Sequence, residues 1–192
     1  MGKRAIIVAG PNGSGKTTFA REYCREHEMR YISADVIAER LDPKNLQKVA
    51  IKAGKLFFKE IDQCIDSGKS FVVESTLSGV SFKNVIQRLK DAEYSISVIF
   101  VFLHTPESCI ARITERVRQK GHYVPEKDVI RRFYRSIRNF WDIYRNLSDR
   151  WYLICNSTDK FVEVAFGLKN EYSVSDEKTF EDFLKVAEGT DA

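Results

Sequence analysis

The sequence predicts a three-layer α/β protein in which helices cover both faces of a mostly parallel five-stranded sheet. Three observations support this fold class. Short apolar runs alternate along the chain with segments of helical periodicity, which is typical of parallel strands joined by helical crossovers. The 192 residues fit a single domain, and a hydrophobic content of 43% is enough for one core. The first apolar run leads directly into a glycine-rich segment that opens a helix.

The glycine-rich segment GPNGSGKTT follows a strand predicted at 5–9 and precedes a helix predicted at 17–28. It matches G-x-x-x-x-G-K-[ST] in the strand–turn–helix context that a P-loop requires. Glycines let backbone N–H groups turn toward a phosphate chain, and the helix N-terminus adds unpaired donors. In this pattern the lysine reaches the β- and γ-phosphates and the next hydroxyl ligates Mg²⁺. We therefore predict a P-loop NTPase or kinase fold that binds ATP, or GTP, with Mg²⁺. The predicted nucleotide-binding residues are Gly10, Pro11, Asn12, Gly13, Ser14, Gly15, Lys16, Thr17 and Thr18, with Thr17 as the Mg²⁺ ligand.

The remaining elements are predicted from apolar spacing and from turn residues. Strands are expected at 30–32, 70–73, 95–103 and 151–155, and helices at 36–41, 43–66, 82–91, 106–119 and 125–147. The helix at 106 has the clearest start, a capping threonine hydroxyl followed by proline. We expect the region 106–147 to form a helical lid. A C-terminal appendage, about 157–192, is expected to add a β-hairpin to the sheet and a last helix at 177–186.

Composition and charge exclude several function classes. The net charge of +4 is modest, and a phosphate site accounts for part of it, so nucleic acid is not indicated as a partner. The four cysteines are far apart and no histidines cluster, which argues against a bound metal other than Mg²⁺. The N-terminus has no apolar signal region, and no apolar run reaches the length of a membrane span. We expect a cytoplasmic protein without membrane contact.

Polar residues at two predicted strand ends are candidates for chemistry, because open α/β sheets bind ligands beyond the carboxyl ends of their strands. Asp35 follows the strand at 30–32 and is a candidate general base, which would accept the proton of a substrate hydroxyl. The alternative is a helix cap. Glu74 and Thr76 follow the strand at 70–73 and are candidates for holding Mg²⁺-bound water or the acceptor. The alternative for this pair is a turn cap.

Arginines concentrate in the predicted lid. A mobile helix–loop–helix segment rich in guanidinium groups fits closure over a nucleotide and stabilisation of the transferring phosphoryl group. The alternative is a solvated basic face, and we expect only two or three of these side chains to contact phosphate. The candidates are Arg112, Arg116, Arg118, Arg131, Arg132, Arg135 and Arg138.

The motifs GPNGSGKTT, ISAD, VVEST and RVRQKGHYVPEKDVIRRFYRSIRNF together resemble the zeta-toxin family of P-loop kinases, from Ile6 to Phe140. The resemblance implies phosphotransfer from ATP to a hydroxyl of a small molecule, with UDP-N-acetylglucosamine as the acceptor known for the family. An inhibitor protein of the antitoxin type is the implied partner. The implied roles are phosphate binding by Lys16, Mg²⁺ binding by Thr17, general base catalysis by Asp35, acceptor binding by Glu74 and Thr76, and stabilisation of transfer by Arg118 and Arg131.

Three other functions compete with this interpretation. An ABC-type ATPase shares the P-loop pattern, but the apolar strand at 95–103 ends in His-Thr-Pro rather than in acidic residues. A polynucleotide kinase would use the basic helices to grip a phosphodiester backbone. A nucleotide-dependent binding module would switch a partner without transferring phosphate, and Asp35 argues against it. A kinase for a small acceptor remains the interpretation that the residues favour.

Overall fold

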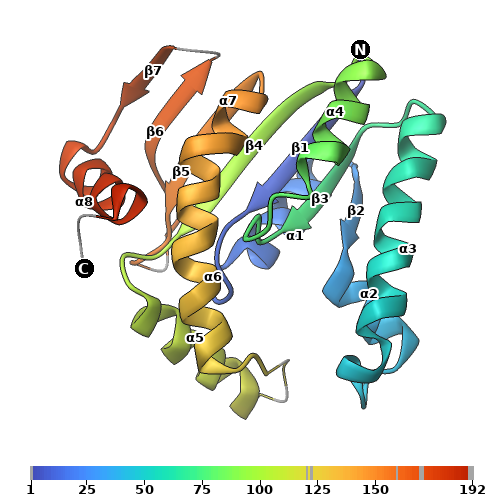
Figure 1. Ribbon diagram of the computed structural model, residues 1–192, viewed down its shortest axis with the longest axis horizontal. Helices are drawn as coiled ribbons and strands as arrows, with labels where there is room; N and C mark the ends of the chain where they lie inside the picture. Colours follow the sequence, from blue (N-terminus) through green and yellow to red (C-terminus); the bar gives the residue numbers. More distant parts are fainter. Residues whose placement is uncertain (1, 120, 122, 159, 169–170, 190–192) are drawn as a thin grey trace.

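The computed structural model describes residues 2–119, 121, 123–158, 160–168 and 171–189. Within these ranges one seven-stranded sheet has the order β2-β3-β1-β4-β5-β6-β7 (Figure 1). The strands are β1 (Arg4–Ala9), β2 (Arg30–Ser33), β3 (Phe71–Ser75), β4 (Ser95–Phe102), β5 (Arg150–Cys155), β6 (Val162–Leu168) and β7 (Glu171–Val174).

The first five strands are parallel and the last two are antiparallel. The register between β1 and β4 pairs Ile7 with Val98, both fully buried, and β4 pairs in parallel with β5. β6 runs antiparallel to β5, and β7 antiparallel to β6. The predicted five-stranded parallel sheet and its C-terminal hairpin are thus confirmed.

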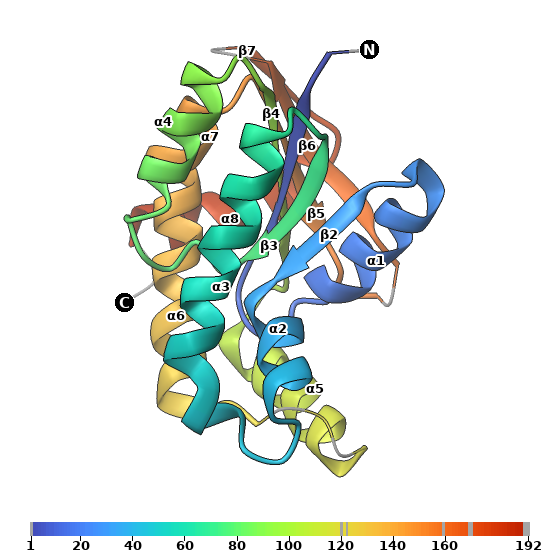
Figure 2. The same ribbon diagram turned by 90° about the vertical axis from the view of Figure 1, so that its right-hand side faces the viewer.

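Helices cover the two faces of the sheet unequally. The described helices are α1 (Lys16–His27), α2 (Ala34–Leu41), α3 (Leu46–Asp66), α4 (Lys83–Asp91), α5 (Pro106–Arg118), α6 (Glu126–Asn139), η1 (Phe140–Tyr144), α7 (Arg145–Leu147) and α8 (Glu177–Glu188). Figure 2 shows α1 on one side of the sheet and α3, α4 and α6 on the other. The buried residues divide accordingly into a large cluster under α3, α4, α6 and α8 and a small cluster under α1. No helix in the described ranges has the length and apolarity needed to cross a bilayer.

The carboxyl ends of the parallel strands lie at one edge of the sheet, where α1, α2 and α5 begin (Figure 1). At the start of α5, Thr105 accepts a hydrogen bond from the Ser108 amide at 3.2 Å, and Pro106 occupies the first turn, as the sequence predicts. This edge places the P-loop, α2 and the lid helices around a common space.

The helix predicted to begin at Pro43 begins at Leu46 instead. Asn45 caps it by accepting a hydrogen bond from the Lys48 amide at 3.3 Å, and Asp42 Oδ1 accepts from the Lys44 amide at 3.0 Å. Pro43 therefore lies in a turn held by Asp42, because two side chains that favour turns and caps outweigh the preference of proline for a first helical turn.

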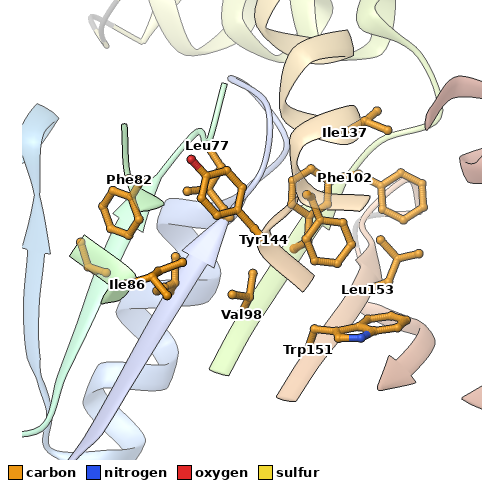
Figure 3. Packing of buried hydrophobic residues seen from close by; sticks show 14 of the residues in the cluster. Leu77, Phe82, Ile86, Val98, Phe102, Ile137, Tyr144, Trp151 and Leu153 are labelled. Atoms are coloured by element: carbon orange, nitrogen blue, oxygen red, sulfur yellow. The ribbon is translucent and has the colours of Figure 1, made fainter. Parts of the chain in front are cut away.

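The long helix predicted at 125–147 is interrupted by a π-helical turn, η1. The wider turn keeps both Phe140 and Tyr144 fully buried. Tyr144 donates to the Gly79 carbonyl at 2.5 Å, and Asn139 Nδ2 donates to the Leu77 carbonyl at 2.8 Å. Figure 3 shows Leu77 and Tyr144 in the same apolar cluster. The end of α6 is thus anchored to the loop that follows β3.

Candidate active site

The P-loop connects β1 to α1, as its sequence predicts. Gly10 has a φ of 141°, and a Cβ there would collide with the Val101 carbonyl of the neighbouring strand β4. Gly15, with a φ of 94°, is the N-cap of α1, and no side chain caps this helix. The first-turn N–H groups of α1 therefore have no side-chain acceptor and are available to an anion. This concave, glycine-lined turn fits a polyphosphate chain.

Four polar side chains meet beside the P-loop. Lys16 Nζ donates to the Pro11 carbonyl at 3.2 Å and lies 3.8 Å from Glu74 Oε1. Thr17 Oγ1 donates to the same Oε1 at 2.9 Å, while the Tyr31 hydroxyl donates to Glu74 Oε2. Lys16 and Glu74 are both buried. Burial first, and the Glu74 carboxylate second, raise the pKa of Tyr31, so its phenol stays a donor at neutral pH.

The oxygen atoms of this cluster can be compared with the ligands that Mg²⁺ takes in proteins. A hydroxyl and a carboxylate oxygen 2.9 Å apart, beside a phosphate cradle, are the oxygen donors that Mg²⁺ takes. Thr17 and Glu74 therefore fit the ion. Thr76, expected to act with Glu74, instead hydrogen-bonds Ser78 Oγ at 3.0 Å. In the described part of the chain no three His, Cys, Asp or Glu side chains group in a way that suits a metal.

Two cavities share Lys16 as a lining residue. One, of about 340 Å³, is bounded by the P-loop, α1, α2 and α5, and we call it the nucleotide cavity. The other, of about 440 Å³, is bounded by α2, α3, α6 and the loop after β3, and we call it the acceptor cavity. Both are lined by Lys16, Ser33 and Asp35, and by no other common residue among the described ones.

Asp35 lies where the two cavities meet. It is the second residue of α2, is exposed, and no side-chain hydrogen bond caps this helix. The capping role considered as an alternative is therefore not seen. Glu74 and Thr76 line the acceptor cavity but not the nucleotide cavity.

The arginines of the lid separate between the cavities. Arg112 and Arg116 line the nucleotide cavity. Arg131 lines the acceptor cavity and pairs with Asp128 at 2.8 Å. Arg118 lines neither cavity, is 75% exposed and lies 3.3 Å from Glu115, so the structure does not bring it to the other site residues.

Two further arginines among the seven candidates also line the acceptor cavity. Arg132 Nη1 donates to Asn12 Oδ1 of the P-loop at 3.3 Å, and Arg135 lines the same cavity. Their spacing to Arg131 placed them in the basic cluster, but only the position of α6 shows which of them face the site.

Two other residues were not predicted from the sequence. Tyr31 alternates with the buried Ile32 along β2, and no pattern pointed from it to Glu74. Asn156 follows β5 directly, and its side-chain amide donates to the Ser14 carbonyl at 2.9 Å. The strand-end rule that selected Asp35 and Glu74 applies equally to Asn156 and could have found it.

Comparison with known proteins agrees with this architecture. The chain is 33% identical over 134 residues to an uncharacterized protein of Haemophilus influenzae, an alignment that covers 68% of this chain and 92% of that protein. It is 38% identical over 87 residues to the cytidylate kinase of Saccharolobus islandicus, covering 41% of this chain. The chain spans 46% of that kinase, less than half of its length.

Solved structures share the fold at low sequence identity. An AvrRxo1-ORF1:AvrRxo1-ORF2 complex matches with a TM-score of 0.76 and 16% identity over 97% of this chain. The chain spans 64% of that structure's chain, less than two thirds. A structure of the PezAT chromosomal toxin-antitoxin system of Streptococcus pneumoniae matches with a TM-score of 0.65 and 16% identity, covering 98% of this chain and 85% of its own.

A family model supplies the assignment. The model described as an AAA domain matches residues 6–138, which include most of β1, the P-loop, Asp35, Glu74 and most of the lid. The match covers more than half of the chain and agrees with the P-loop geometry. The chain therefore belongs to the AAA domain family.

Proposed function

We propose that the protein is a kinase that moves the γ-phosphoryl group of ATP to a hydroxyl of a small molecule held in the acceptor cavity. The observation that supports this most is the meeting of two cavities at Lys16 and Asp35. A donor bound along the P-loop and an acceptor on the other side would bring their reacting atoms together there. A nucleotide switch has no need of a second cavity at this point.

On the donor side, the P-loop N–H groups and Lys16 would bind the β- and γ-phosphates. Thr17 and Glu74 would hold Mg²⁺, which when bound neutralises charge on the β- and γ-oxygens. The Tyr31 hydroxyl keeps Glu74 in place from the opposite side. GTP would fit the same phosphate contacts, which do not distinguish the base.

On the acceptor side, Asp35 would accept the proton of the attacking hydroxyl. The acceptor oxygen forms a bond to the γ-phosphorus as the bond to the β,γ-bridging oxygen breaks and ADP leaves. The proton passes to a carboxylate oxygen of Asp35. Thr76, which lines the same cavity, would orient the acceptor.

Guanidinium groups would stabilise the charge on the transferring phosphoryl group. Arg131 and Arg132 line the acceptor cavity, and Arg132 already contacts the P-loop. The transfer role that the zeta-toxin resemblance implies for Arg118 requires the tip of the lid to move toward the nucleotide cavity, since Arg118 lies outside it here.

Two acceptors follow from different observations. The zeta-toxin resemblance favours UDP-N-acetylglucosamine as the acceptor. The fold shared with the PezAT toxin-antitoxin structure favours an antitoxin-type inhibitor as partner. The similarity to cytidylate kinase, with three arginines at the acceptor cavity, favours a nucleoside monophosphate such as CMP. The chemistry separates them, because the attacking phosphate oxygen of CMP carries no proton at neutral pH. Asp35 is therefore needed for the first acceptor only.

The test is transfer from γ-labelled ATP with Mg²⁺ to UDP-N-acetylglucosamine, CMP and 5′-hydroxyl RNA in parallel. For a hydroxyl acceptor, Asp35→Asn should lower transfer by about 10²–10⁴-fold while ATP still binds. Lys16→Ala should lose both binding and transfer. The exposed Asp66→Asn, at the far end of α3, should change neither.

The three acceptors lead to different conclusions. Label on CMP that survives Asp35→Asn would replace the hydroxyl acceptor by a nucleotide. Label on RNA would favour a polynucleotide kinase. Hydrolysis of ATP without any labelled acceptor, unchanged in Asp35→Asn, would contradict the base assignment and return the switch module to consideration.

A further inference from the structure

Asn156 joins three parts of the nucleotide site through three different groups. Its backbone N–H donates to the Phe102 carbonyl at 3.0 Å, which extends the β4–β5 ladder by one residue. Its side-chain amide donates to the Ser14 carbonyl at 2.9 Å, and its backbone carbonyl accepts from Arg112 Nη2 at 2.6 Å. Only 6% of the residue is exposed. Asn156 thus ties the P-loop and α5 to the end of β5.

The hydrogen bond to Ser14 has a consequence for the next amide. In a planar trans peptide the C=O and N–H groups point in opposite directions. The Ser14 carbonyl points at Asn156, so the Gly15 N–H points away from it, and Gly15 lines the nucleotide cavity. The Asn156 amide therefore fixes the direction of a P-loop donor without itself lining the cavity.

Close packing at Gly15 supports this arrangement. A Cβ at Gly15 would collide with Asn156 Nδ2, so the amide occupies the space that only glycine leaves open. Ser14 is fully buried, which leaves its carbonyl no solvent donor to take the place of the amide. Without the Asn156 amide, the peptide group between Ser14 and Gly15 would lose the hydrogen bond that keeps the Gly15 N–H directed away from Asn156.

We propose that Asn156 is a positioning residue for phosphate binding, which holds the Gly15 N–H toward the nucleotide phosphates and holds Arg112 beside them. The inference rests on nucleotide binding by the P-loop and not on phosphotransfer. Because the effect is exerted on the phosphates, it should grow with their number in the ligand. This distinguishes positioning from a general loosening of the fold.

The test is calorimetric binding of ADP and AMP, without acceptor. Asn156→Asp keeps the shape of the side chain but replaces the donor by a carboxylate that faces the Ser14 carbonyl. We expect the Kd for ADP to rise about tenfold or more, the worth of one buried hydrogen bond, and the Kd for AMP to rise much less. The ratio of the two affinities should fall accordingly.

The matched control is Asn146→Asp. Asn146 Nδ2 also donates to a backbone carbonyl, that of Asp142 at 3.0 Å, but on the exposed surface of α7, so the affinity ratio should stay at its wild-type value. Asn156→Ala carries no buried charge and replaces Asn156→Asp if that variant does not fold.

An unchanged ADP affinity in Asn156→Ala, or an equal loss for ADP and AMP, would overturn the assignment. Failure of the wild type to transfer phosphate would leave it intact as long as ADP binds. Failure of the wild type to bind ADP more tightly than AMP would overturn both this inference and the proposed use of the P-loop.

Discussion

Replacing Tyr31 by phenylalanine tests whether the sheet itself holds the Glu74 carboxylate in place. The Tyr31 hydroxyl donates to Oε2, which leaves Oε1 to accept from Thr17 at 2.9 Å. A hydrogen bond to a charged group contributes about 1.5–3 kcal/mol. Because Tyr31 is only half-buried, we take the lower end, about 1.5 kcal/mol, for the loss of free energy of unfolding.

That loss should appear as a Tm lower by about 3–6 °C for a domain of this size. The control is Tyr134→Phe, since the half-buried Tyr134 makes no hydrogen bond to any described residue through its hydroxyl, and its Tm should stay within about 1 °C of wild type. In a double-mutant cycle with Glu74→Gln, the coupling between the two sites should be about 1 kcal/mol or more.

The contribution of Tyr31 also has a pH dependence of defined sign. Its folded-state pKa is raised, mainly by burial and then by Glu74, so its stabilising effect is complete below the unfolded value of about 10. The effect is lost as the pH rises above that value toward the folded pKa. Equal effects of Tyr31→Phe with and without Glu74→Gln would refute the reasoning, because the two side chains would then not interact.

Three further tests concern the packing of glycines, of Cys109 and of Tyr144. Gly167→Ala should lower the free energy of unfolding, measured in urea, by about 2 kcal/mol or more, because a Cβ would collide with the buried indole of Trp151. Gly54→Ala should raise it by about 0.5–1 kcal/mol, because Gly54 lies in a helix with open space around its Cα. Burial raises the pKa of Cys109 to about 12. Iodoacetamide at pH 8 should therefore alkylate this thiol only after the protein unfolds. Alkylation of the folded protein would contradict the burial of Cys109. Tyr144→Phe removes the hydroxyl anchor of η1 and should lower the unfolding free energy by about 1 kcal/mol, with a wild-type value arguing that the anchor contributes nothing.

Much of the fold was predictable because the central strands β1, β3 and β4 are apolar runs and the start of α5 carries a capping threonine followed by proline. The hydrophobic run at 95–103 became β4, buried along nearly its whole length. The predicted start of α3 at Pro43 was wrong because Asp42 holds Pro43 in a turn and Asn45 caps the helix after it. The π-helical turn was missed because one extra residue in a turn hardly changes the apolar spacing that predicts a helix.

The position of a site residue was predictable where the residue directly follows a parallel strand. Asp35 and Glu74 were selected because strand ends meet at one edge of the sheet. The hydrogen bond from Tyr31 to Glu74 was not predictable, because it crosses from β2 to β3 and depends on the register of these two strands. The choice among the arginines also depended on the placement of α6, which no local pattern encodes.

The separate walls of the two cavities have a kinetic consequence. The P-loop and α2 border both cavities, but beyond these the donor would contact α1 and α5, and the acceptor would contact α3 and α6. Neither ligand would need to pass through the site of the other, so binding in random order and a ternary complex are expected. Initial-rate lines for the two substrates should then intersect rather than run parallel, and the phosphorus should invert its configuration in a single displacement.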